Sequence, residues 1–121
     1  MSEDLLTTPA SLDIGDVTVH ASATSNAVQH RWTVNIVVVR RPGQEPVDAK
    51  DLDVQLLDPG GEVITPLERP KGVLTEAGTS LASSVNATFI FPEPERTPAR
   101  LKVSFRRREA EFAIESKSPP Q

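Results

Sequence analysis

The chain has 121 residues, no cysteine and a formal net charge of −4, with 13 basic against 17 acidic side chains. This acidic balance argues against a dedicated nucleic-acid binder, which needs a basic field to neutralise phosphates, and against docking on anionic membranes. The absence of cysteine excludes disulfides, thiolate metal sites and cysteine nucleophiles, and it leads us to expect a cytoplasmic protein.

Apolar and polar residues alternate with period two along most of the chain, which predicts an all-β protein. Residues 1–13 are polar and aperiodic, so we expect a flexible N-terminal tail there. Residues 14–115 are predicted to form one β-sandwich domain, and residues 116–121 a disordered C-terminal tail. In chain order, the predicted strands cover residues 16–23, 28–39, 52–57, 63–65, 79–91, 100–106 and 110–115.

The strongest predicted strand covers residues 28–39. Trp32 begins an alternating apolar face, and the many β-branched residues disfavour a helix. On the opposite face, Val37 and Val39 stand where polar residues are expected. They need a cover, which is a loop, the N-terminal Leu5-Leu6 or another chain.

The last two predicted strands form a hairpin. Their apolar residues must share one face, because a register slip of one residue would turn one set towards solvent. Pairing Phe105 with Phe112 satisfies this condition, and it also sets Arg106 opposite Glu111.

With about seven or eight strands and turn signals at regular spacing, residues 14–115 resemble bacterial immunoglobulin-like domains. The resemblance is carried by the strand with Trp32, by the Asp58-Pro59-Gly60-Gly61 turn and by the strand at residues 85–91 before the closing hairpin. It implies an antiparallel two-sheet sandwich. The chain lacks both the cysteine pair and the tyrosine corner of antibody domains, so the resemblance carries no functional residue over.

We expect no catalytic, cofactor-binding or metal-binding residue. His20 and His30 are the two histidines, and neither has an evident third ligand or adjacent nucleophile. Asp48, Asp51 and Asp53 are interpreted as a solvated acidic edge, because calcium needs six to eight oxygen ligands and Lys50 lies among them.

Two groups of arginines and one pair of valines are the candidates for partner binding. Arg106, Arg107 and Arg108 lie at the predicted tip of the last hairpin, and Arg40 and Arg41 end the strongest strand. Guanidinium groups bind carboxylates bidentately, so these residues suit an acidic protein partner; the alternative is that they only solubilise turns. Val37 and Val39 could bind a second copy of the chain. An edge strand is the alternative place for such a contact.

These features together predict a non-catalytic binding module, a protein-binding accessory or assembly subunit, rather than an enzyme. The alternative is a small-molecule or carbohydrate-binding sandwich with its site in end loops such as residues 43–50 or 92–98. A divergent hydrolase is the third reading. A protein-binding module predicts an exposed patch, whereas the other two require a concave cleft.

Overall fold

The computed structural model describes residues 2–79, 81–94 and 99–116. Apart from one short 3-10 helix, its regular elements are strands, and all their pairings are antiparallel, which confirms the all-β prediction. No helix in these ranges is long and apolar enough to cross a bilayer. The elements are β1 (Ser2–Thr8), β2 (Ser11–Ile14), β3 (Val17–Asn26), β4 (Arg31–Arg40), η1 (Ala49–Asp51), β5 (Leu52–Leu57), β6 (Val63–Ile64), β7 (Glu76–Gly78), β8 (Ser83–Pro92), β9 (Ala99–Phe105) and β10 (Arg108–Ser116).

The strands form one continuous hydrogen-bonded path in the order β6-β5-β9-β10-β1-β3-β4-β8-β7, and β2 pairs with β3 beside it. The sequence predicted about seven or eight strands in total, divided between two separate sheets. The path is continuous because β1 pairs with β3 through residues 2–5 and with β10 through residues 5–8. β1 therefore joins the two halves of the strand path, β6-β5-β9-β10 and β3-β4-β8-β7.

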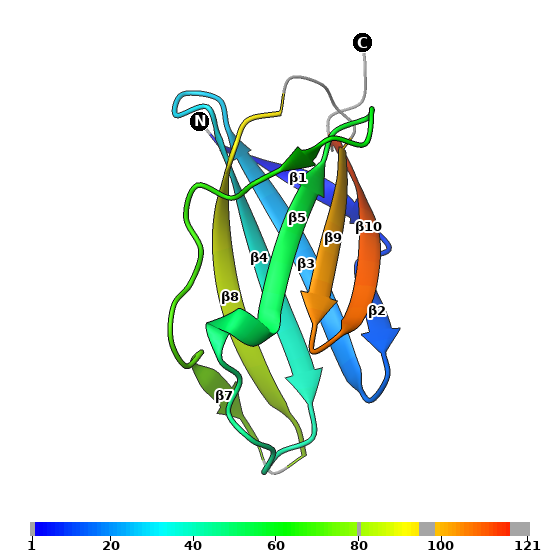
Figure 1. Cartoon of the computed structure of the whole chain (residues 1–121), viewed down its shortest axis with the longest axis vertical. Coiled ribbons are helices and arrows are strands. Elements are labelled where there is room, and N and C mark those ends of the chain that lie inside the picture. The colour runs from blue at the N-terminus through cyan, green and yellow to red at the C-terminus, as the bar shows by residue number, and fades with distance from the viewer. Residues whose placement is uncertain (1, 80, 95–98, 117–121) are drawn as a thin grey trace.

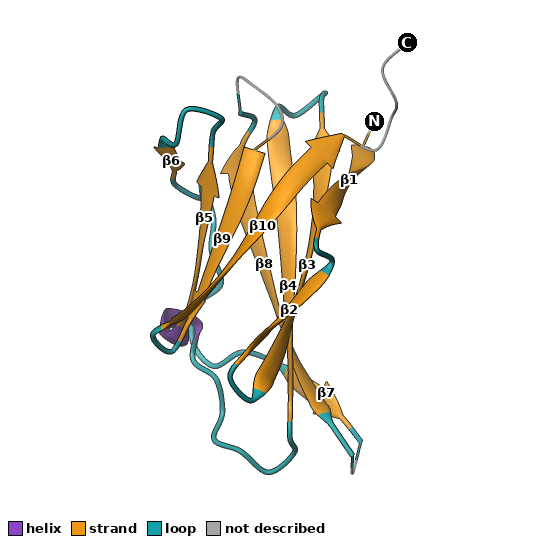
Figure 2. Ribbon diagram, turned by 90° about the vertical axis from the view of Figure 1, so that its right-hand side faces the viewer, coloured by secondary structure: helices purple, strands orange, loops and turns teal. Residues whose placement is uncertain are grey.

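The path folds over on itself, so that β5, β9 and β10 lie in front of β3, β4 and β8 in Figure 1, and the same layering is visible from the side in Figure 2. Inward-facing residues from both halves pack into one hydrophobic core. Trp32, Phe105 and Phe112, expected in the core, are 2%, 4% and 1% exposed. Alternate residues of the long strands supply this core, as period-two alternation requires.

The N-terminal segment is not the tail that its composition predicted, because β1 and β2 occupy most of residues 1–13. Leu5 joins the core, and the buried hydroxyl of Thr7 donates a hydrogen bond to the carbonyl of Ala21 at 2.8 Å. The strand is held by pairing on both sides, which a count of polar residues does not register. At the other end, Ser116 is the last residue of β10, and residues 117–121 lie outside the described residues.

The strand predicted over residues 79–91 starts later, at Ser83. Leu81, which an inward face of that longer strand would include, is 87% exposed. The hydroxyl of Thr79 accepts hydrogen bonds from the amides of Leu81 and Ala82, and this local turn replaces strand pairing.

Candidate functional site

Arg106 and Arg107 alone connect β9 to β10, since Phe105 and Arg108 pair directly across the turn. Both residues have positive φ angles, 46° and 74°, as a two-residue type I′ turn requires. The predicted pairing of Phe105 with Phe112 is therefore wrong: Phe112 pairs with Leu101. The prediction that the side chain of Phe112 points into the core is confirmed. The register was wrong because type I′ turns favour Asn-Gly, and Arg-Arg carries no such signal.

Arg106 is held against the neighbouring loop. Its Nε lies 3.6 Å from Oδ2 of Asp51, its Nη2 donates to the carbonyl of Pro46 at 3.3 Å, and its guanidinium stacks 5.2 Å from the ring centroid of Phe105. These contacts fix the turn to η1 and to the segment before it. Arg106 therefore positions the turn more than it presents a free charge.

Arg108, the first residue of β10, has its guanidinium directly over Gly15 in the β2–β3 turn. Gly15 has a φ of 73°, which favours glycine, and the absence of a Cβ leaves room for the end of the Arg108 side chain. Arg107 is exposed, and unlike Arg106 it takes part in no ion pair within the described ranges, a property that it shares with Arg108.

Two open grooves flank η1. The first, of about 430 Å³, lies beside the turn and is lined by Lys50, Asp51, Asp53, Ser104, Arg106 and Arg107. The second, of about 530 Å³, lies on the other side of η1, with Leu52 and Phe89 among its lining residues, and Arg69 and Lys71 contribute basic groups to it. Lys50 and Asp53 line both grooves, so the two form one continuous surface.

This surface is locally basic although the chain is acidic. Five basic side chains line the grooves, against three aspartates: Lys50, Arg69, Lys71, Arg106, Arg107, Asp48, Asp51 and Asp53. The aspartates are committed to local contacts. Asp48 accepts a hydrogen bond from the amide of Lys50 at 3.0 Å, Asp51 faces Arg106, and Asp53 lies 3.5 Å from Arg69. The acidic edge expected here therefore consists of a helix cap and two ion-pair partners.

Arg40 and Arg41, the second candidate group, do not act together. The side chain of Arg40 is completely buried and bonds to Glu76, with 3.0 Å between Nε and Oε2, so Arg40 is not accessible to a partner. Its Nη1 has no hydrogen-bond partner among the described residues. Arg41 is exposed. Period-two alternation from Trp32 places residue 40 on the inner face, a signal that the sequence already contained.

Val37 and Val39 are half-buried on the outer face of β4. Leu5-Leu6, one of the three covers considered, does not lie over them, because β1 lies between β3 and β10, and Leu5 points into the core. Around these valines, His20, Ser22, Asn86 and Thr88 are exposed, so no described segment of the chain covers this face.

The histidines lie apart from the grooves. His20 is on the outer face of β3 opposite Val37, and His30 lies in the β3–β4 turn with its Nδ1 3.0 Å from Oε2 of Glu93. Within the described ranges, no group of three or more acidic or histidine side chains is arranged to hold a metal ion.

No family model, curated protein or solved structure matches this chain significantly. The candidate site therefore depends on its own geometry. Sequence reasoning singled out the arginines but missed the contribution of Lys50 and Lys71. The signal available for Lys50 was its place directly before a strand that pairs with β9, which brings it to the same end as the arginine turn.

Proposed function

We propose that the chain is a non-catalytic, immunoglobulin-like β-sandwich module that binds an acidic segment of a protein partner at the arginine turn and the adjoining grooves. The folded path of antiparallel strands with one shared core supports the sandwich description. The lack of cysteine supports a reducing compartment, the cytoplasm, and the proposed role is that of an accessory subunit of a larger bacterial assembly.

The single observation that carries this proposal is the state of Arg107. Its backbone has a φ of 74°, a conformation that costs a non-glycine residue on the order of 1 kcal/mol or more. Its side chain is exposed and makes none of the ion pairs given for the described ranges, so folding gains little from it. A strained residue that adds little to stability suits a binding role, and an exposed guanidinium suits a carboxylate.

The grooves extend this role to neighbouring residues. Lys50 and Lys71 add positive charge to the surface that Arg107 begins. Both grooves are open, as docking of an extended peptide requires. An acidic segment lying across η1 would meet these charges in succession, and charge attraction would raise its association rate.

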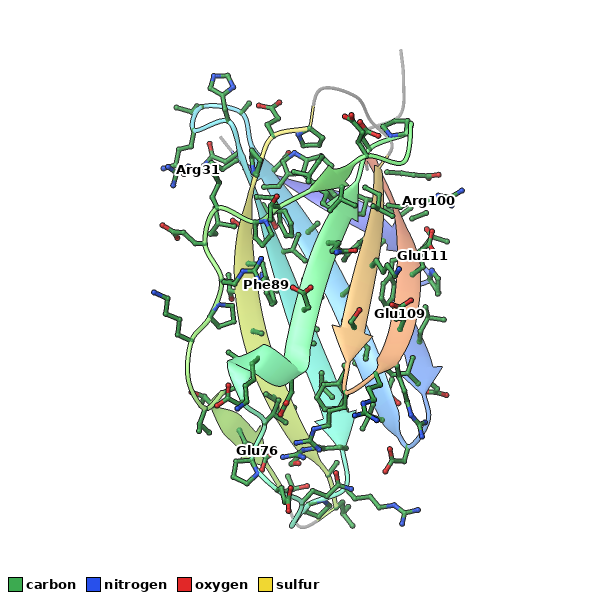
Figure 3. All side chains as sticks on the ribbon, viewed as in Figure 1. Arg31, Glu76, Phe89, Arg100, Glu109 and Glu111 are labelled. Carbon is green, nitrogen blue, oxygen red and sulfur yellow. The ribbon has the colours of Figure 1, made fainter. Side chains whose placement is uncertain are left out.

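The test is a fluorescence-anisotropy titration of a labelled octaglutamate peptide at about 50 mM and about 500 mM NaCl. We expect binding that weakens with salt and that is reduced by Arg107→Ser. The matched control is Arg31→Ser, which removes the same charge from an exposed arginine at the start of β4, labelled in Figure 3. Equal binding by the two variants would remove the arginine turn from the proposal.

A second candidate function is supported by the groove that contains Phe89. Its volume of about 530 Å³ lies within the range of small-molecule sites, and polar and charged side chains line it above the buried Leu52 and Phe89. A small anionic molecule or sugar would then bind in this groove beside Arg69 and Lys71, away from the arginine turn. Arg69→Ser would reduce binding of such a ligand, whereas Arg107→Ser would not.

A further inference from the structure

The two outer faces of the folded sheet differ sharply in charge. On the β5–β9–β10 face, charged residues predominate, among them Asp53, Arg100, Lys102, Glu109, Glu111 and Glu115, and Figure 3 labels three of these along β9 and β10. Two cross-strand ion pairs stabilise it, Arg100 with Glu111 at 3.1 Å and Lys102 with Glu109 at 3.2 Å.

The outer face of β3, β4 and β8 has no charged residue in its first four rows. Strand pairing aligns its residues in rows of three, one from each strand. Eight are serine, threonine or asparagine, one is histidine and three are aliphatic. The rows are Thr18, Val39 and Ser84; His20, Val37 and Asn86; Ser22, Asn35 and Thr88; and Thr24, Thr33 and Ile90.

Charged residues surround this neutral face. Arg31 lies in the fifth row at one end, Asp13 lies on β2 beside Thr18, and Glu68 bridges to Ile90 at the opposite edge. A centre depleted of charged residues within a charged rim is one feature that protein interfaces share. A solvated outer face, by contrast, normally carries charges, as the other face of this molecule does.

We propose that this neutral face binds a second copy of the same chain, face to face. Hydroxyl and amide side chains both donate and accept hydrogen bonds, so a face made of them complements itself. A face of carboxylates or ammonium groups would not. In addition, contact through this face keeps the charged β5–β9–β10 faces of the two copies apart. This matters because each chain carries a net charge of −4.

The symmetry of the dimer follows from Arg31. In a two-fold contact each patch meets its own copy. Running the strands of the two copies antiparallel keeps the two Arg31 side chains at opposite ends. The axis then passes between the second and third rows, which brings the Asn35 side chains of the two copies close together on either side of it.

The area of the face limits how tight the dimer can be. The four neutral rows span residues 18–24 of β3, 33–39 of β4 and 84–90 of β8. With strands about 4.8 Å apart and a rise of about 3.4 Å per residue, they present roughly 340 Å² per copy. Two copies would bury roughly 700 Å², the size of a weak, transient contact. The expected dimer is therefore a reversible one with a dissociation constant on the order of 0.1 mM or weaker.

The test is sedimentation velocity of the full chain over a dilution series up to about 0.5 mM, a range chosen to suit a small interface. The wild type should shift from monomer to dimer as concentration rises. Asn35→Asp should raise the dissociation constant by about tenfold or more, because it places like charges across the axis. The fold should survive, since an aspartate still accepts the hydrogen bond that Thr88 donates to Asn35 at 2.7 Å.

Gln55→Glu is the matched control. It makes the same amide-to-carboxylate change on the outer face of β5, where Lys102 pairs with residue 55. This variant should dimerise as the wild type does. A wild type that stays monomeric throughout the series would overturn the proposal, and so would an equal loss in both variants. Neither result bears on peptide binding at Arg107, which does not depend on the neutral face.

Discussion

Phe105 and Arg108 face each other across the β9–β10 turn, so that two arginines with positive φ carry the whole connection. The chain accepts a strained turn here although Asn-Gly would satisfy the same geometry. Since strain at a surface turn has no benefit for folding, it points to a role for the side chains.

Arg107→Gly should stabilise the protein by about 0.5 kcal/mol, because the strain relieved at a φ of 74°, on the order of 1 kcal/mol or more, exceeds the entropy that glycine adds to the unfolded chain. Urea denaturation measures this change in the free energy of unfolding. Arg41→Gly is the control: Arg41 is also exposed, but it is not among the residues with positive φ, so glycine should destabilise it slightly. A loss of stability in Arg107→Gly would show that the side chain of Arg107 contributes to folding.

Glu76→Ala should cost about 3 kcal/mol, because it leaves the buried guanidinium of Arg40 without its ion-pair partner. The side chain of Arg40 is completely buried, whereas that of Glu76 is 34% exposed. For comparison, Glu111→Ala removes the exposed pair with Arg100 and should cost about 0–1 kcal/mol. Equal losses in the two variants would mean that burial of Arg40 does not matter to stability.

Phe112→Ala should cost about 3–5 kcal/mol, since Phe112 is 1% exposed in the centre of the core. Leu81→Ala, at a position that is 87% exposed, should change stability by about 0.5 kcal/mol or less. The two variants are compared by thermal or urea unfolding. A small effect for Phe112→Ala, or a large one for Leu81→Ala, would contradict the arrangement of the core.

Alternation along the sequence was sufficient to predict the strand faces, because a strand has only two faces and one of them is apolar. It placed Trp32, Phe105 and Phe112 in the core, and it also implied that Arg40 points inward. The register of the last hairpin could not be obtained this way. Pairings that differ by two residues on a strand leave the same faces buried, so only the turn distinguishes them.

The N-terminal strand was missed for a different reason. β1 contributes few apolar side chains, and its place between β3 and β10 depends on backbone pairing with both. Such pairing is a long-range property that local composition does not reveal. The basic grooves were missed for a similar reason. η1 brings Lys50 to the turn of a hairpin that lies about fifty residues further along the chain, which is again a long-range contact.

Backbone amide chemical shifts during titration with octaglutamate show directly whether the arginine turn binds an acidic peptide. We expect the largest shifts on Lys50, Asp51, Arg106 and Arg107, which line the first groove, and we expect them to shrink in Arg107→Gly although that variant is more stable. Shifts confined to the neutral face of β3, β4 and β8, or a complete absence of shifts at low salt, would contradict binding at this turn.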